Sequence, residues 1–340
     1  MNKVGIRTLA LEDPSRPAWS SNGNRPLLSE VWYPASDNAE ETIFSFGTPE
    51  PLFQFDSVAI EADLQQEKKD YPLVVLSHGT GGSALQMGWL AWHLAAHGYI
   101  AVAVNHHGNN SLEPYLAHGF LLWWERAKDL TLLIDLLLNE VTEFKGRIDE
   151  NRIGVSGFSL GGYTAIELVG GRCSLEHFEA FCTSEHRDAI CEGPKEFPGI
   201  MEEMPRLESE DKSFQESLRR HNESYKDERV KAAFVMAPAL GMAFSEAGLA
   251  GVDVPVHVVV PEGDKVVPPK TNGHRFAELI ADADMEVLAG PVDHYVFLCE
   301  ATECGKRLEP DCAIDHFLVD RRQIHLHVGE QAVMFFDRHL

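Results

Sequence analysis

The chain has 340 residues, 44% of them hydrophobic, which is enough for one large domain with an insertion or for two ordinary domains. Acidic residues outnumber basic ones by 53 to 29, and the formal net charge is −24. A surface of this charge repels phosphate backbones, so we expect no nucleic-acid partner. No apolar run approaches the roughly 18 residues that a membrane-spanning helix needs, so we also expect no membrane span.

The N-terminus and the cysteines bear on the cellular compartment. The first residues, "MNKVGIRTLALEDPSRP", reach an acidic pair and a proline too early for the apolar region of a signal peptide, which favours a cytoplasmic location. The alternative is export with removal of a leader. The six cysteines form two groups of three, without C-x-x-C or zinc-finger spacing, so we expect no structural zinc. Free thiols suit a reducing cytosol and disulfides suit an exported protein.

Strand-like and helical segments alternate through the first half of the chain. Residues 4–11 and 27–34 read as a pair of strands, and "YPLVVLSHG" (71–79) as a strand buried on both faces. A helix should follow Ser83, with Met87, Leu90 and Leu94 on one face and an end at Gly98. The segments after it are a buried strand in 99–108, a long helix over 121–140, a strand at 152–157 and a helix over 160–171.

This alternation predicts an α/β fold with a doubly wound, mostly parallel sheet. It breaks at residues 171–230, which carry 15 acidic and 9 basic side chains and three of the cysteines. We expect this segment to be an inserted helical cap, the alternative being a surface excursion without a function. The core then comprises 1–170 and 231–340. The alternation resumes with strands in 230–238, 254–264 and 285–290, a helix over 272–282 and a final helix toward 330–340.

The stretch "GFSLG" (157–161) has the pattern of a nucleophile elbow, a sharp turn that exposes a catalytic serine. An apolar strand leads into the turn and a helical pattern leads out. Gly157 and Gly161 are needed because side chains there would collide with the neighbouring strand and helix. Ser159 Oγ should therefore lie above the carboxyl edge of the sheet, at a helix N-terminus. The alternatives are a structural turn and a phosphate-binding turn, and the second lacks G-x-G-x-x-G and G-K-[ST].

A serine hydroxyl needs a base within hydrogen-bond reach and a third group that orients the base. In this architecture the acid comes first and the histidine second, each just after a later strand. Asp264 follows one apolar strand and His294 follows the next, so the sequence predicts a triad of Ser159, His294 and Asp264. Glu262 sits closer to the strand end, and Asp293 is adjacent to the histidine, which makes both poorer candidates. The alternatives are a turn aspartate and a solvated loop histidine.

Acyl transfer also needs donors for the tetrahedral oxyanion. We expect the backbone N–H of Leu160 and, from the glycine-rich loop "SHGTGG" (77–82), the N–H of Thr80. A glycine-rich turn without a catalytic role is the alternative for this loop. His106 and His107 follow a strand at the same edge and could line the substrate pocket. No carboxylate cluster accompanies them, so we expect no metal.

These residues resemble the α/β-hydrolase superfamily and, more narrowly, bacterial predicted dienelactone hydrolases and platelet-activating-factor acetylhydrolases. The stretches that carry the resemblance are "RPLLSEVWYPAS", "YPLVVLSHGTGG", "HLAAHGYIAVAVNHHGNN", "GFSLGG", "DERVKAAFVMAPALG" and "DHYVFL". The resemblance implies an α/β-hydrolase fold, no cofactor, and hydrolysis of an ester, thioester or lactone through an acyl-enzyme. It also implies the nucleophile Ser159, the base His294 and the donors at Thr80 and Leu160.

The chain departs from those families at two positions. Dienelactone hydrolases have a cysteine where this chain has Ser159, and animal-type acetylhydrolases place the acid where this chain has Ala237. The second departure favours Asp264 as the acid. We therefore expect a serine carboxylic-ester hydrolase that acts on a small-molecule ester. The alternatives are an amidase or acyltransferase with the same triad, and a non-catalytic ligand-binding scaffold.

Overall fold

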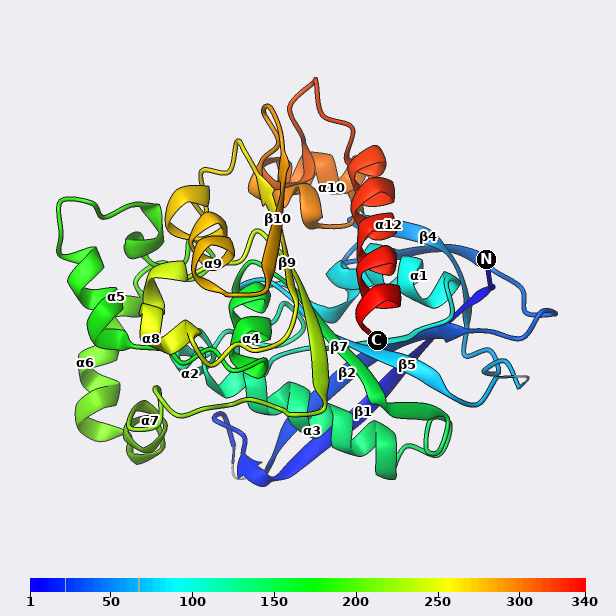
Figure 1. Cartoon of the computed structure of the whole chain (residues 1–340), viewed down its shortest axis with the longest axis horizontal. Coiled ribbons are helices and arrows are strands. Elements are labelled where there is room, and N and C mark those ends of the chain that lie inside the picture. The colour runs from blue at the N-terminus through cyan, green and yellow to red at the C-terminus, as the bar shows by residue number, and fades with distance from the viewer. Residues whose placement is uncertain (22, 67) are drawn as a thin grey trace.

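The structure is a computed structural model that describes residues 1–21, 23–66 and 68–340 (Figure 1). Within these residues one mixed sheet has eleven strands in the order β10-β9-β8-β7-β5-β6-β2-β1-β4-β11, with β3 paired to β4. The six strands from β10 to β6 are mutually parallel. The predicted α/β-hydrolase fold with a mostly parallel sheet is confirmed.

The strands are β1 Val4–Pro17, β2 Asn24–Pro34, β3 Thr42–Phe46, β4 Phe53–Ile60, β5 Tyr71–Ser77, β6 Ile100–Val104, β7 Ile148–Phe158, β8 Val230–Met236, β9 Val256–Pro261, β10 Ala283–Leu288 and β11 Glu300–Ala301. The α-helices are α1 Gly88–Ala96, α2 Ala117–Leu121, α3 Glu125–Asn139, α4 Leu160–Leu168, α5 Leu175–Cys182, α6 Ile200–Glu210, α7 Lys212–Leu218, α8 Glu246–Leu249, α9 Gly273–Leu279, α10 Glu303–Leu308, α11 Pro310–Ala313 and α12 Arg321–His339. Short 3₁₀ helices are η1 Ala84–Met87, η2 Ala189–Glu192, η3 Gly241–Ala243, η4 Pro269–Thr271 and η5 His294–Phe297. No helix in the described ranges is long and apolar enough to cross a membrane.

The central strands are buried on both faces because helices cover both sides of the sheet. Along β5, Leu73 and Val75 belong to a core with α3, α4 and α9, whereas Val74 and Leu76 face a second core with α1 and α12. This alternation is the period-2 geometry of a strand. It explains why β5 reads as a continuous apolar run, as the sequence predicts.

Most predicted elements are confirmed, and the differences have local causes. The long helix begins at Glu125 rather than 121, because the backbone at Leu122 leaves the helical region and separates the short α2 from α3. Ser83 precedes η1 but makes no side-chain capping bond, and α1 ends at Ala96, two residues before Gly98. The strands β3, β4 and β11 and the helices α10 and α11 were not predicted from the sequence.

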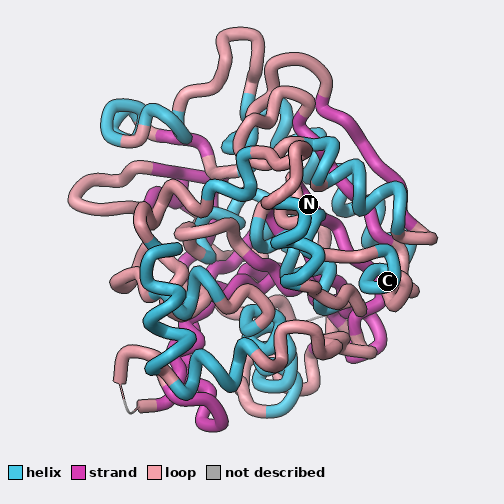
Figure 2. The backbone as a smooth tube through the Cα atoms, turned by 90° about the vertical axis from the view of Figure 1, so that its left-hand side faces the viewer, coloured by secondary structure: helices cyan, strands magenta, loops and turns pink. Residues whose placement is uncertain are grey.

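Residues 171–230 form the helices α5, α6 and α7, which Figure 2 shows in front of the strands when the molecule is turned to face them. Buried Ile200, Leu207 and Phe214 from this segment form a separate apolar cluster with Phe120 and Trp124, outside the two main cores. The segment therefore packs on the chain between β6 and α3. Its role as a cap stays a prediction.

One disulfide lies within the described part of the chain, a question that the sequence left open. Cys182 at the end of α5 is bonded to Cys191 in η2, so the bond lies within the first group of cysteines. Cys173, Cys299, Cys304 and Cys312 are free.

Candidate active site

Ser159 occupies a strained turn between β7 and α4. Its backbone φ is +56°, a value that side chains rarely adopt, and its N–H donates to the carbonyl of Met236 at 3.0 Å. Two glycines make the turn possible. A Cβ on Gly161 would lie 1.8 Å from the carbonyl oxygen of Ser77, and one on Gly157 would lie 2.1 Å from that of Gly161. The start of α4 is therefore pressed against the end of β5, and the turn projects the serine above the sheet edge.

The structure brings the three predicted triad residues together. Asp264 Oδ2 lies 2.6 Å from His294 Nδ1, and His294 Nε2 lies 3.0 Å from Ser159 Oγ. The other carboxylate oxygen, Oδ1, accepts hydrogen bonds from the N–H groups of Val266 and Val267. An ionised carboxylate only accepts, so Nδ1 of the imidazole carries the proton and Nε2 accepts from the serine hydroxyl. This tautomer is the one a general base requires.

The two carboxylates that the sequence analysis sets aside have other partners. Asp293 accepts from the N–H of His294, and Glu262 accepts from the N–H of Gly290. Each therefore stabilises a loop near the triad without reaching the imidazole through its side chain.

Two stacked rings, those of Trp89 and His325, donate hydrogen bonds to the turn that carries His294. Trp89 Nε1 donates to the carbonyl of Phe297 at 2.7 Å, and His325 Nε2 donates to that of Val296 at 2.8 Å. The Trp89 and His325 rings stack with a centroid distance of 4.2 Å and an interplanar angle of 7°. Burial lowers the pKa of His325 to about 3, so this imidazole is neutral. Neither ring shows a sequence signal, because their partners are carbonyls more than 25 residues away.

The two predicted oxyanion donors are free to bind a substrate. In the described part of the chain, neither the N–H of Thr80 nor that of Leu160 has a protein acceptor. Gly79 brings the first of these donors close to the serine: a Cβ on Gly79 would lie 3.3 Å from Ser159 Cβ. A backbone without a side chain at this point allows the turn to approach Ser159.

The far side of the same turn is tied to the loop after β6. Gly81 N–H donates to Asn109 Oδ1 at 2.6 Å, and the Tyr115 hydroxyl donates to the Gly81 carbonyl at 2.9 Å. Residues from the 171–230 segment complete this side, because Phe197 packs on Tyr115 and Glu196 Cβ lies 3.3 Å from the position of a Cβ on Gly81. Asn109 and Tyr115 were not among the predicted site residues, although Asn109 stands in the same loop as His106 and His107.

His106 and His107 do not join the triad. His106 Nδ1 contacts Asp129 at 2.8 Å and its Nε2 contacts Ser77 Oγ at 2.9 Å. His107 Nδ1 contacts Glu113 at 3.0 Å, and its Nε2 accepts from the N–H of Trp19. Both rings are buried and use both nitrogens on protein partners, which speaks against a pocket role. No group of three or more His, Cys, Asp or Glu side chains in the described ranges is arranged to hold a metal ion.

Comparisons with known proteins identify the family of the chain. The alpha/beta hydrolase family model matches residues 74–303, more than half of the chain, and the chain belongs to this family. Two curated relatives, Cutinase 2 of Thermobifida cellulosilytica and Cutinase cut1 of Thermobifida fusca, are each 27% identical over 111 residues. These matches cover 32% of this chain and 38% and 32% of the two cutinases, so the chain spans about a third of the length of the curated relatives it matches.

A solved structure covers nearly the whole chain. A ferulic acid esterase from Streptomyces cinnamoneus matches with a TM-score of 0.64 at 22% identity, over 99% of this chain and 90% of that one. At this identity the likeness shows a shared fold.

We predict that Gly161→Ala prevents the elbow from forming. The added Cβ would meet the backbone of Ser77 and not a flexible side chain, so β5 and α4 must separate. The expected loss in free energy of unfolding is about 3 kcal/mol, at the upper end for overpacking. Urea unfolding measures it. Gly23→Ala, where the added Cβ would meet only the Ser21 hydroxyl at 3.4 Å, is the control. Equal stability of the two variants would contradict the packing account.

We predict that His325 makes stability depend on pH. Its folded-state pKa of about 3 is below its ordinary value of 6.5, so the unfolded chain binds more protons between these values and stability falls with falling pH. Glu30 and Glu167, whose pKa values burial raises, act in the opposite direction, so a comparison between variants isolates the histidine. Between pH 4 and 6, the free energy of unfolding should rise with pH less steeply in His325→Gln than in the wild type. The expected difference in slope is about 1.4 kcal/mol per pH unit.

The measurement is urea unfolding at several pH values. The control is a histidine removed from the surface, His186→Gln, whose side chain is 81% exposed. An unchanged slope in His325→Gln would mean that this imidazole is not held neutral in the folded state.

Proposed function

We propose that this member of the alpha/beta hydrolase family is a serine hydrolase that cleaves a carboxylic ester through Ser159, His294 and Asp264. The observation that carries the proposal is the unbroken hydrogen-bonded chain from Asp264 to His294 to Ser159, with distances of 2.6 Å and 3.0 Å. A serine whose hydroxyl donates to an imidazole of fixed tautomer is an activated nucleophile. The unpaired amides of Thr80 and Leu160 supply the second requirement of acyl transfer.

The first half of the reaction forms an acyl-enzyme. Ser159 Oγ attacks the ester carbonyl carbon while its proton moves to His294 Nε2. The negative charge that develops on the carbonyl oxygen is stabilised by the N–H groups of Thr80 and Leu160. The tetrahedral intermediate then breaks its bond to the alcohol oxygen, which takes the proton from the imidazolium and leaves. Asp264 stabilises the imidazolium while it exists.

The second half of the reaction restores the enzyme. A water molecule gives a proton to His294 Nε2 and attacks the acyl carbon through its oxygen. The intermediate is stabilised by the same two amides, and its collapse breaks the bond to Ser159 Oγ. The serine oxygen recovers a proton from the imidazolium, and the carboxylic acid is released. No step needs a cofactor.

The relatives support an ester as the substrate. The cutinases and the ferulic acid esterase are named for ester hydrolysis, and we extend that reaction class to this chain. The narrower resemblance to dienelactone hydrolases and acetylhydrolases rests on the sequence stretches alone. A thioester or lactone, an amide, or acyl transfer to an acceptor other than water would use the same three residues.

We propose that residues 171–230 serve as a cap that shapes the substrate site. Two contacts support this role: Glu196 lies beside the oxyanion turn at Gly81, and Phe197 packs on Tyr115. The disulfide between Cys182 and Cys191 stiffens this segment. Because disulfides are rare in the cytosol, the bond favours the exported alternative over the cytoplasmic location that the N-terminal sequence suggests.

We predict that Ser159→Ala abolishes hydrolysis of p-nitrophenyl butyrate and labelling by a fluorophosphonate probe. The loss should exceed about 10⁴-fold in kcat, because the nucleophile is absent and only binding and the amides remain. The matched control is Ser156→Ala, three residues earlier, whose buried hydroxyl has no hydrogen-bond partner in the described part of the chain.

The control variant should keep wild-type turnover. Far-ultraviolet circular dichroism and the melting temperature should be unchanged in Ser159→Ala. Retention of more than about one hundredth of wild-type turnover would rule out Ser159 as the nucleophile, given the magnitude expected for its loss.

A further inference from the structure

The structure contains a second chain of a serine, a histidine and an aspartate. Ser77 Oγ lies 2.9 Å from His106 Nε2, and His106 Nδ1 lies 2.8 Å from Asp129 Oδ2. The three residues come from the end of β5, the loop after β6 and the middle of α3. Because the Asp129 carboxylate accepts, His106 Nδ1 carries the proton and Nε2 accepts from the serine hydroxyl. The chemical order is that of Asp264, His294 and Ser159.

The surroundings prevent Ser77 from acting as a nucleophile. Its relative exposure is 0%, and that of His106 and of Asp129 is 1%. Arg126 Nη2 donates to Ser77 Oγ at 3.3 Å, so the oxygen is held on both sides. Burial, and next the charge of Arg126, lower the pKa of His106 to about 3, so the ring stays neutral. The chain of hydrogen bonds is therefore a fixed support.

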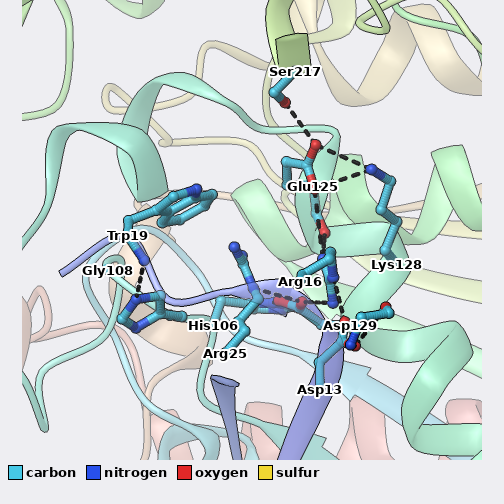
Figure 3. Close-up of polar contacts among 12 residues, drawn as sticks. Asp13, Arg16, Trp19, Arg25, His106, Gly108, Glu125, Lys128, Asp129 and Ser217 are labelled. Carbon is cyan, nitrogen blue, oxygen red and sulfur yellow. Dashed lines mark hydrogen bonds and ion pairs between the residues drawn. The ribbon is translucent and has the colours of Figure 1, made fainter. Parts of the chain in front are cut away.

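A dense ion cluster holds the aspartate end of this support (Figure 3). Asp129 Oδ1 lies 2.6 Å from Arg16 Nη2 and 3.2 Å from Arg25 Nε. These cations come from β1 and β2, so the hairpin at the N-terminus is tied to α3. With two guanidinium groups in addition to His106, Asp129 keeps its ionised form without help from Arg126.

The support ends at the turn that carries the oxyanion donor. Arg126 Nη2 also donates to the carbonyl of His78, and the N–H of His106 donates to His78 Nε2 at 3.2 Å. The other ring nitrogen of His78, Nδ1, therefore carries the proton and donates to the carbonyl of Gly79 at 2.7 Å. Both carbonyls that precede Thr80 are thus held by groups beneath the turn.

Because the peptide unit is planar, the contact of the Gly79 carbonyl also fixes the direction of the Thr80 N–H. The Gly79 carbonyl and the Thr80 N–H belong to one trans peptide unit and point in opposite directions. Once the carbonyl is fixed toward the His78 ring, the N–H must face away from that ring. Gly79 lies close to Ser159, because a Cβ added to Gly79 would lie 3.3 Å from Ser159 Cβ. The direction of the Thr80 N–H is therefore set by the contacts of His78 and Arg126.

We propose that Arg126 is a positioning residue for ester hydrolysis, which aims the Thr80 N–H at the oxyanion by holding the His78 carbonyl and Ser77. The proposal rests on the proposed function. Arg126 is 2% exposed, and its Nε and Nη1 have no hydrogen-bond partner among the described residues. Burial of a guanidinium with two such nitrogens costs free energy of folding, so a contribution to stability does not explain why Arg126 is buried here.

The test is Arg126→Met, measured by steady-state hydrolysis of p-nitrophenyl butyrate and by inhibition with phenylboronic acid. We expect kcat to fall about 10- to 100-fold, somewhat less than removal of a whole oxyanion donor, with KM within about threefold. Affinity for the boronic acid, which forms a tetrahedral adduct with the serine, should fall by the same factor as kcat. Arg126→Lys should recover part of kcat, because its ammonium can donate to the same carbonyl.

The matched control is Arg229→Met. Arg229, which directly precedes β8, pairs at 2.5 Å with Asp135, and Asp135 lies on α3, the helix that also carries Arg126. The variant Arg229→Met should lower the melting temperature as much as Arg126→Met does, or more. Its kcat should stay at the wild-type value. If Arg126→Met does not fold, Ser77→Ala makes the same test, with an expected threefold to tenfold loss of kcat at unchanged KM.

The outcomes separate the two proposals. Absence of ester turnover in the wild-type protein would overturn the proposed function. Wild-type turnover together with kcat of Arg126→Met within twofold of wild type would overturn the positioning role. The same role is overturned if kcat falls while boronic acid affinity does not, because the oxyanion donor would then be intact.

Discussion

The contact between Gly161 and the carbonyl of Ser77 is the constraint on which the rest of the site depends. At this point the start of α4 and the end of β5 touch backbone to backbone, with no room for a side chain. The contact forces Ser159 into its positive-φ conformation and places it beside the turn that follows β5. Donors from two separate segments, Thr80 and Leu160, can then converge on one substrate atom. The strain at the serine is thus offset by packing on the neighbouring strand.

The two Ser–His–Asp chains show that chemistry is decided by surroundings. Ser159 has an imidazole on one side and, nearby, two amides without an acceptor among the described residues. Ser77 has an imidazole on one side and Arg126 on the other, and no exposed surface. The first arrangement is the one that the proposed mechanism requires, whereas the second holds the oxygen in place. A search for residue types alone would find both, and only access and hydrogen-bond geometry distinguish them.

The triad residues could be proposed from the sequence because each lies at or shortly after the end of a strand. Parallel strands end at one edge, so Ser159, Asp264 and His294 had to meet there once their strands were recognised. The role of His106 could not be predicted in the same way, although it also follows a strand at that edge. Its partner Asp129 is a buried residue of α3 more than 20 positions away, and only the three-dimensional structure brings the two together.

The parts of the fold that escaped prediction lack a periodic pattern. β11 has two residues, too few for an alternation. The residues of β3 are exposed or half-buried, so their side chains carry no core signal. The anchors of the His294 turn, Trp89 and His325, come from α1 and α12 and act on carbonyl groups, which sequence does not distinguish. Pairing of Cys182 with Cys191 depends on how close the folded segment brings them.

The most direct test of the account is a crystal structure of the wild-type protein with phenylboronic acid. We expect boron to be bonded to Ser159 Oγ, with one boronate oxygen about 2.7–3.1 Å from the amide nitrogens of both Thr80 and Leu160. A second boronate oxygen should lie within hydrogen-bond reach of His294 Nε2. An adduct on another side chain, or a boronate oxygen that faces away from both amides, would contradict the assignment of the nucleophile and its oxyanion site.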